Sequence, residues 1–369
     1  MSDIKVTVVM PIYNAYDYLR PALDSVIDQT LREIEIICID DGSTDTTLSL
    51  LKEYQKADER IRLVTENNAG VSVARNKGLV RARGEYVIFL DADDFFELTM
   101  LERLYNAAKA DDLDITVCGY DMYNDKAARF EQSVDGESER AFPTGEVVSK
   151  GTLQDGIFQS TTSYVWNKLF KTSFLRDKEL NFAPELYVFE DVYFILTTLS
   201  MAQRVGKISD ELIHHRIYSN QSRPKLFKKY YHQVPLVYKK AKDFLTAHGT
   251  YIPLARSFLN VSVSRCYKIY NLLWHDAKGN FFDLLHDGYA DMLGWFAHEA
   301  QEFESEELYE FAASVGLYTH EQYKKMGQRK MPGLGKIGKD ELNRKINIMR
   351  KRERFKLFVK RLFGGKKRG

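Results

Sequence analysis

The stretch EYVIFLDADDFF, residues 85–96, joins an apolar run to three carboxylates and two aromatic rings. The apolar run does not alternate with polar residues, which is typical of a strand that helices cover on both faces. The carboxylates of Asp91, Asp93 and Asp94 follow at its end. Open α/β sheets gather ligand groups beyond the carboxyl ends of their strands. The stretch therefore predicts a buried parallel strand that ends at a candidate binding site.

Short apolar runs alternate with helically spaced segments before this stretch. IKVTVVM, IEIICID and IRLVTE have the character of strands, and YLRPALDSVIDQTL between the first two has the spacing of a helix. Repeated strand and helix predict an α/β fold with a mostly parallel central sheet. Polar residues also follow the first two strands: Tyr13 and Asn14, then Asp40 and Asp41.

The pattern changes twice along the rest of the chain. Between about residues 120 and 150 it breaks down into a loop or insertion, and from about residue 222 to 326 the spacing is helical and rich in aromatic residues. We expect an α/β domain at 1–222, a helical C-terminal subdomain at 223–330 and a basic amphipathic tail at 331–369.

Composition narrows the class of protein. Three cysteines lie far apart without metal-type spacing, which argues against a disulfide framework and for a reducing compartment. No run of about eighteen apolar residues occurs, and MSDIKVTVVM enters a strand without a leader-like segment. We expect a cytoplasmic protein without a membrane span.

The formal net charge of +1 conceals an asymmetry. Residues 336–369 hold 14 Lys or Arg against three acids, a net of +11, so the remainder carries −10. Within this tail Phe355, Phe358, Val359 and Leu362 recur at helical spacing among basic residues. The pattern predicts a helix that lies on an anionic membrane, at the inner face of the plasma membrane. The alternatives are packing on the acidic body or on a second copy of the chain; no nucleic-acid partner is expected.

The close carboxylates of Asp91 and Asp93 need a compensating charge. A single Asp at a strand end usually caps a helix or forms a turn, and we expect that role for Asp45. Two carboxylates one residue apart repel each other, and a divalent cation with oxygen ligands relieves that repulsion. A metal held there suits an anionic substrate such as a nucleotide diphosphate.

Six segments in order resemble the inverting glycosyltransferase family 2, which has the GT-A fold. They are VVMPIYNAYDYLRPALDSVIDQT, EIICIDDGSTD, NNAGVSVARNKGL, GEYVIFLDADD, WNKLFK and FED, and the resemblance covers roughly residues 4–222. It implies a bacterial enzyme that moves a hexose or N-acetylhexosamine from a UDP-sugar to a hydroxyl of an acceptor, which is a glycan, a lipid-linked saccharide, a polymer or a glycoprotein.

The resemblance assigns donor-binding roles residue by residue. Tyr13 matches the position that stacks on uracil, and Asp41 the carboxylate that accepts from the base. Arg75 and Asn76 match a segment along the nucleotide and sugar, although an Arg on a helix more often lies on a solvated face. The remaining positions assigned to the donor are Pro11, Asn14, Asn68 and Ala92.

The resemblance also assigns a metal site. Asp93 matches a direct ligand of Mn²⁺ or Mg²⁺, and Asp91 a residue that contacts the ribose or the metal's water. The metal would bridge both phosphates and neutralise the departing diphosphate. His215 is a candidate third ligand and Arg216 a candidate partner of the diphosphate, with ordinary packing as the alternative. Asp94 is expected to cap the following helix, outside the site.

The acceptor side requires a base, because direct displacement removes a proton from the attacking hydroxyl. Asp191 in FED matches that base, and a helix N-terminus would favour its ionised form. Capping by Glu190 or Asp191 is the alternative. Trp166 and Lys168 match a segment lining the cleft, where they would stack on a sugar and approach phosphate or acceptor, unless both are structural.

Two other functions compete. A nucleotidyltransferase would place a loop rich in Gly and Lys after the first strand, and MPIYNAYDY has none. A non-catalytic nucleotide-sugar-binding subunit of a transferase complex would not need the intact Asp93 and Asp191.

Overall fold

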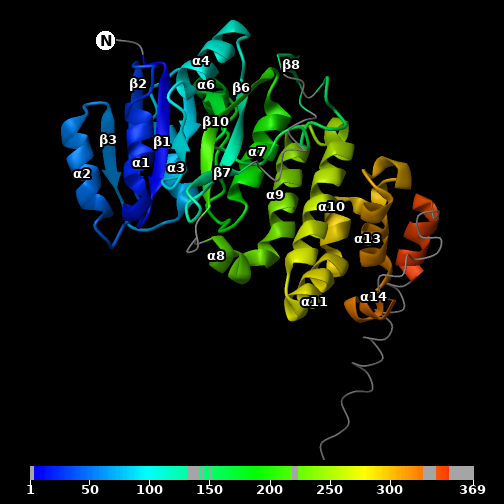
Figure 1. Ribbon diagram of the computed structural model, residues 1–369. Helices are drawn as coiled ribbons and strands as arrows, with labels where there is room; N and C mark the ends of the chain where they lie inside the picture. Colours follow the sequence, from blue (N-terminus) through cyan, green and yellow to red (C-terminus); the bar gives the residue numbers. More distant parts are fainter. Residues whose placement is uncertain are drawn as a thin grey trace, which may run out of the picture. The chain divides into compact units, whose positions relative to one another are not determined.

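The computed structural model describes residues 4–131, 142, 145–149, 151–217, 223–326 and 338–348 (Figure 1). The chain forms two compact units. One holds the described residues up to Gln233 together with Asp243–Leu254, and the other holds Val234–Lys242 and the described residues from Ala255 onward. The second unit thus begins later than residue 223. The end of the expected basic tail, residues 349–369, lies outside the described residues, so its helix remains a prediction.

The first unit is built on a mixed sheet in the order β3-β2-β1-β4-β9-β6-β10-β5. Its first four strands are all parallel, as the repeated strand–helix order predicts. They are β1 (Val6–Ile12), β2 (Ile34–Asp40), β3 (Ile61–Thr65) and β4 (Tyr86–Phe89). The helices between them are α1 (Tyr16–Ile27), α2 (Thr47–Ala57) and α3 (Val71–Arg81). The predicted α/β class is confirmed.

The other half of the sheet contains a second parallel pair, β6 (Ile115–Asn124) and β10 (Val205–Ile217). Between the two halves lies β9 (Lys168–Lys171), antiparallel to both β4 and β6. The short edge strands are β5 (Phe95–Phe96), β7 (Arg129–Glu131) and β8 (Val147–Val148). The helices of this half are α4 (Met100–Ala110), α6 (Thr172–Asp177), α7 (Glu190–Met201) and α8 (Arg223–Tyr230), followed by the turn η1 (Tyr231–Gln233).

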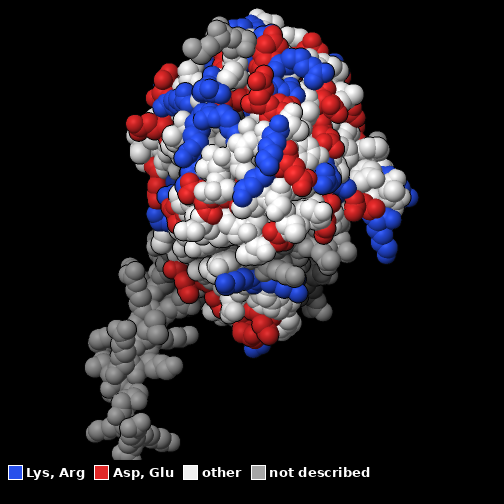
Figure 2. All heavy atoms as spheres, turned by 90° about the vertical axis from the view of Figure 1, so that its left-hand side faces the viewer, with Lys and Arg blue, Asp and Glu red and all other residues white. Residues whose placement is uncertain are grey.

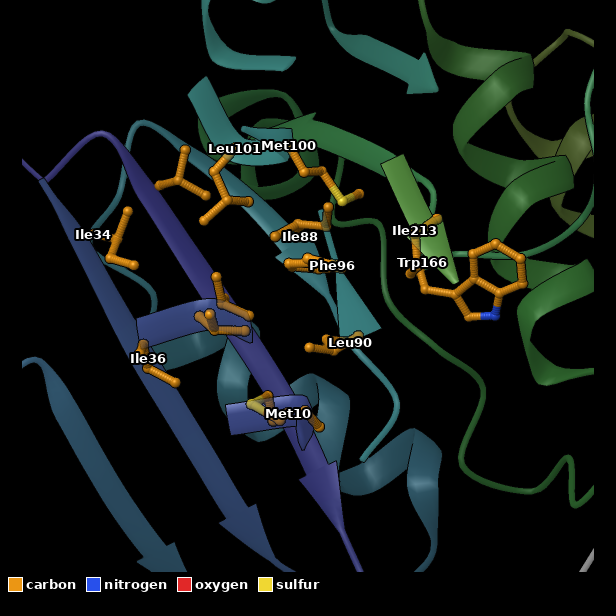
Figure 3. Close-up of a cluster of buried hydrophobic side chains, with 14 of the residues drawn as sticks. Met10, Ile34, Ile36, Ile88, Leu90, Phe96, Met100, Leu101, Trp166 and Ile213 are labelled. Carbon is orange, nitrogen blue, oxygen red and sulfur yellow. The ribbon is translucent and has the colours of Figure 1, made fainter. Parts of the chain in front are cut away.

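Apolar side chains on one face of the sheet form a continuous core (Figure 3). Met10 of β1, Ile36 of β2 and Ile88 of β4 are fully buried there, together with Met100 and Leu101 of α4. Burial of each large apolar side chain contributes about 1.5–3 kcal/mol. The core runs across the sheet as far as Trp166 and Ile213, so it fixes the strand ends from which the candidate site is built.

Gly78 brings α3 against the sheet. A Cβ at this position would lie 2.2 Å from Cγ1 of Val9 on β1, a distance that real side chains do not tolerate. The glycine of the segment ARNKG therefore allows close packing, which holds Arg75, one turn earlier on α3, over the strand ends.

The second unit is helical, as the aromatic-rich spacing predicts. Its main elements are the first part of α9 (Val234–Ala247), then α10 (Ala255–Leu272), α11 (His275–Leu284), α12 (Ala290–Leu293), α13 (Glu306–Leu317), α14 (His320–Met326) and a helix at 339–348. Leu342 and Ile346 of that last helix are buried, and Asn343 Nδ2 donates to the Phe296 carbonyl at 2.9 Å. The described part of the expected basic tail, residues 338–348, is therefore fixed to this unit.

The surface of the described residues carries both signs of charge. On the face in Figure 2, Lys and Arg side chains lie among Asp and Glu side chains. No helix in the described parts of the chain is long and apolar enough to cross a membrane.

Candidate functional site

The carboxylates of the central stretch stand on a tight turn between two strands. β4 ends at Phe89, the amide of Asp94 donates to the Asp91 carbonyl at 3.1 Å, and β5 then pairs with β10. Asp91 and Asp93 are partly exposed, whereas Ala92 and Asp94 are buried. The turn therefore presents alternate carboxylates at the carboxyl edge of the sheet.

Asp94 does not cap a helix, so that expectation is wrong. Its carboxylate is fully buried and contacts His215 Nδ1 at 2.9 and 3.1 Å, while the Arg216 amide donates to it at 2.9 Å. The following helix, α4, begins only at Met100. Asp94 instead fixes the end of β10 to the carboxylate turn, because its side chain bonds two consecutive residues of that strand, His215 and Arg216.

His215 is held from two directions. Its ring stacks on Trp166 at 5.5 Å between centroids with an angle of 12° between the planes, and Trp166 stacks on Tyr164 at 4.6 Å. Asp94 therefore fixes the ring through Nδ1, and the stacked aromatic rings fix its plane.

Arg216 is likewise built into the turn. Its Nε donates to the Asp93 carbonyl at 3.0 Å, and its Nη1 pairs with Asp125. The rings of Tyr18, Phe95 and Tyr123 lie 5.3–5.6 Å from the guanidinium carbon. Arg216 thus supports the backbone beneath Asp93.

Trp166 and Lys168 are not at an open surface. Trp166 is 1% exposed, and its ring belongs to the core. Lys168 is fully buried, and its ammonium donates to the carbonyls of Thr162 and Tyr164 at 2.8 and 2.7 Å and to Asn167 Oδ1 at 2.8 Å. These contacts use all three N–H groups of the ammonium. We therefore leave both residues out of the ligand-contacting set.

Arg75 links the carboxylate turn to the start of α7. It is 1% exposed, and its guanidinium donates to Asp91 at 2.6 Å and to Glu190 at 3.0 Å, with the ring of Phe182 5.2 Å away. Burial opposes the charge, but the pKa of Arg75 is still raised, because Asp91, Glu190 and Asp191 all stabilise the cation. The expected alternative of a solvated helix face does not apply to this residue.

Asn76, the next residue on α3, joins a second segment to the helix. Its side chain donates to the Phe182 carbonyl and accepts from the Phe182 amide, both at 2.9 Å. Both the nitrogen and the oxygen of the Asn76 amide thus bond the Phe182 backbone. These contacts give no support to the expected role of Asn76 in donor binding.

The ends of β1 and β2 form the other side of the site. Tyr13 is 50% exposed, and Asn14 adopts a left-handed backbone conformation with φ 48°. Asn14 Oδ1 accepts from the Thr44 amide at 2.8 Å, which ties the two strand ends together. Asp45 accepts from the Thr47 amide at 2.9 Å, but Thr46 and not Asp45 occupies the N-cap position of α2. Pro11 is buried within β1.

Asp41 organises the loop that leads into α3. It is 5% exposed, and its two carboxylate oxygens accept from the amides of Ala69 and Gly70 at 2.8 and 2.9 Å. Each oxygen still has a second lone pair. Asn68, one residue before this contact, is exposed. Tyr13, Asn68 and Asp41 therefore lie on neighbouring loops at one end of the parallel strands.

Asp191 stands in the first turn of α7. The preceding Phe189 adopts a left-handed conformation with φ 57°, so the chain turns sharply into the helix. Glu190 is buried against Arg75, whereas Asp191 is partly exposed and its Oδ1 accepts from the Val192 amide at 2.8 Å. The FED motif thus divides its acids: Glu190 anchors the helix, and Asp191 is the one with an accessible face.

A metal at this site would need ligands beyond the protein. Among the residues that the structure describes, no group of three or more His, Cys, Asp and Glu side chains is close enough together to hold a metal ion. The arrangement of His215 nevertheless suits a ligand, because metal-bound histidines commonly have a carboxylate on the other ring nitrogen, and Asp94 occupies that position.

Comparisons with known proteins agree with this geometry. The family model described as glycosyl transferase family 2 matches residues 7–171. The chain is 30% identical over 248 residues to the putative glycosyltransferase EpsH of Bacillus subtilis, covering 66% of this chain and 70% of that protein. It is 32% identical over 258 residues to the uncharacterized glycosyltransferase YibD of Escherichia coli, covering 69% and 70%.

A similar fold occurs in a solved structure. The crystal structure of S. aureus TarS 1-349 in complex with UDP superposes with a TM-score of 0.64 at 21% identity, covering 88% of this chain and 93% of that one. The similarity extends over both compact units and identifies the fold.

Proposed function

Because the chain belongs to glycosyl transferase family 2 and has its GT-A fold, we propose that it is an inverting, UDP-sugar-dependent glycosyltransferase. It transfers a hexose or N-acetylhexosamine to a hydroxyl of a glycan, polymer or glycoprotein acceptor. The observation that carries the proposal is the guanidinium of Arg75 between Asp91 and Glu190. This contact brings the donor-side turn beside the helix that presents Asp191, as a single displacement requires.

The donor nucleotide binds at the ends of β1 and β2. Tyr13 offers an exposed ring for the base, and Asp41 offers a fixed acceptor for the N3–H of uracil. The crystal structure of S. aureus TarS 1-349 described above was solved with UDP, which supports a uridine nucleotide. Asp91 faces the ribose side of the turn, where Arg75 holds it in one position.

Asp93 and His215 are the residues that would hold Mn²⁺ or Mg²⁺, with the diphosphate and water as further ligands. Asp94 and Trp166 orient the His215 ring, and Arg216 supports the backbone of Asp93. The ion, when bound, neutralises charge on the departing diphosphate. Since carboxylate, imidazole and phosphate oxygen suit these divalent ions, the side chains fit the group.

Asp191 is the base. Its position at the start of α7 favours the ionised carboxylate, and its partly exposed face can receive the proton of the acceptor hydroxyl. Attack from the side opposite the diphosphate inverts the anomeric carbon. The second candidate is a nucleotide-sugar-binding subunit without turnover, in which Asp191 would only cap α7, as its bond from the Val192 amide allows.

Release of the nucleotide from a panel of UDP-sugars and GDP-sugars, with a set of acceptors and with and without Mn²⁺, tests the function. We expect release with at least one UDP-sugar and loss of it in Asp191→Asn, while UDP binding persists. Binding without release for every sugar and acceptor would favour the non-catalytic subunit, and release from GDP-sugars alone would contradict the assignment of uracil.

A further inference from the structure

Two tyrosines, one exposed and one partly exposed, form a stacked pair in the first unit. Tyr187, in the segment before α7, is 55% exposed, and its ring stacks on Tyr230 of α8 at 4.8 Å with an angle of 18°. The Tyr187 amide donates to Oε1 of the buried Gln233 at 3.0 Å. The backbone of Tyr187 is therefore held in place, while its ring is exposed and the ring of Tyr230 is partly exposed.

The pair is tied to the segment that carries the base. Phe189 contacts Phe227 of α8 at 6.4 Å between ring centroids, so α8 meets this segment at two points one helical turn apart. Asp191 follows Phe189 by two residues. A molecule lying on the tyrosine pair therefore lies against the segment that leads into Asp191 and α7.

Basic side chains accompany the rings. Lys228 and Lys229 of α8 are exposed, and α8, RPKLFKKY, contains no acidic residue. Lys229 Nζ lies 4.9 Å from the centroid of the Tyr230 ring. Aromatic rings present a flat apolar surface to the C–H face of a sugar, and ammonium groups pair with anions. A surface with both rings and ammonium groups favours a ligand that has both a C–H face and an anionic group. A neutral sugar chain lacks the anion, and a free anion lacks the C–H face.

We propose that Tyr187, Lys228, Lys229 and Tyr230, the α8 face, bind the acceptor, and that the acceptor is an anionic glycan or polyol polymer. Its ring or polyol carbons lie on the tyrosines, and the phosphate or carboxylate of the adjoining unit pairs with the lysines. This rests on the proposed function, since the α8 face is placed by its connection to Asp191.

Binding of three defined oligomers to the full chain, saturated with UDP, tests the proposal. The probes are maltohexaose, an oligogalacturonate hexamer and a glycerol-phosphate hexamer, which are neutral, carboxylate-bearing and phosphate-bearing. We expect one of the two anionic hexamers to bind at least tenfold more tightly than maltohexaose. Which of the two binds more tightly shows whether the protein prefers a carboxylate or a phosphate. Tyr187→Ala should weaken that binding about tenfold, and so should the pair Lys228→Glu with Lys229→Glu.

The matched control is Lys52→Glu with Lys56→Glu, two exposed lysines on α2 beside strand β3. It makes the same change in net charge and should leave affinity for the oligomer unchanged. Binding that is equal for neutral and anionic oligomers, absent for all three, or equally weakened by the α2 control overturns the proposal. UDP affinity, measured separately in every variant, should be unaltered; failure of the parent chain to bind UDP would instead contradict the proposed function.

Discussion

Arg75 donates a 2.6 Å hydrogen bond to Asp91, and the same buried guanidinium reaches Glu190, 115 residues further along the chain. The donor-side turn and the start of α7 therefore share one cation. We expect Arg75→Met to leave the buried carboxylate of Glu190 and the partly exposed carboxylate of Asp91 without their partner, and to lower the free energy of unfolding by about 3 kcal/mol. Arg81→Met, on the same helix but bonded only to the Lys77 carbonyl among the contacts described, is the matched control. Equal melting temperatures for the two variants would contradict the role of Arg75.

Asp41 holds the loop that leads into α3, and in the proposed function it also binds the base, so its variants are compared with two nucleotides. We expect Asp41→Ala to release the Ala69 and Gly70 amides and to lose the preference for UDP over CDP, because the N3 acceptor is gone. Tyr13→Ala removes a half-exposed ring and should weaken the binding of UDP and of CDP to the same extent. Calorimetric titration of each variant with UDP and CDP measures the difference. An Asp41→Ala variant that binds UDP as before would remove Asp41 from the site.

Variants of Asp93 and Asp191 should fail differently, because in the proposed mechanism Asp93 serves the leaving group and Asp191 the nucleophile. We expect Asp93→Asn to weaken the Mn²⁺-dependent part of UDP-sugar binding. Asp191→Asn should bind UDP-sugar normally and lose transfer about a hundredfold to ten-thousandfold. Titrations with and without Mn²⁺, beside single-turnover rates, separate the two. Near-normal transfer by Asp191→Asn would place the base elsewhere.

Glu35 on β2 makes the first unit sensitive to acid. Its buried carboxylate accepts from Thr7 Oγ1 at 2.8 Å and pairs with Arg83 and Arg62. Burial alone would raise the pKa of Glu35, but these hydrogen bonds outweigh it and the pKa is lowered from 4.5. A lowered pKa stabilises the fold above about pH 4.5, and that stability is lost as pH falls through the folded-state value.

We therefore expect Glu35→Gln to lower the free energy of unfolding at pH 7 by about 1–3 kcal/mol and to flatten its decline below pH 4.5. Urea unfolding at a series of pH values measures both. Glu53→Gln on α2, a 70% exposed carboxylate, is the control that should change neither. A parallel decline for Glu35→Gln and the parent chain would exclude Glu35 as its source.

The basic tail should hold the protein on anionic membranes. Several Lys and Arg near a charged leaflet contribute about 1 kcal/mol each, in addition to burial of the apolar face. The truncation should end after Ile348, because an earlier end would remove Leu342 and Ile346 from their buried positions. We expect the full chain, but not this truncation, to co-sediment with anionic vesicles and neither with neutral ones. Equal sedimentation of both would favour the alternative in which the tail packs on protein.

Local sequence patterns were sufficient to predict the parallel strands and the carboxylates that follow them. The runs around Val8, Ile37 and Ile88 lack alternation because helices cover both faces, and the carboxyl ends of parallel strands converge. The FED motif similarly predicted the start of α7. These features depend on residues close together in sequence.

Sequence reasoning missed the role of Asp94 and left the role of Lys168 open, because each role depends on contacts that no sequence pattern marks. Asp94 is a buried anchor because His215, 121 residues later, returns beside it on β10. Lys168 is structural because Thr162 and Tyr164 turn their carbonyls toward it. Neither contact has a local signature. The burial of Arg75 could have been suspected from the nearby Gly78, which marks α3 as closely packed.

The antiparallel strand β9 has a consequence for how the chain reaches this fold. β1 to β4 can assemble from the first ninety residues, but β4 and β6 each keep an unpaired edge until Lys168–Lys171 has been synthesised and inserted between them. Open edges of this kind are sites of intermolecular pairing. Aggregation during synthesis should thus be most probable before residue 171 emerges, and fragments that end earlier should be the least tractable to refold.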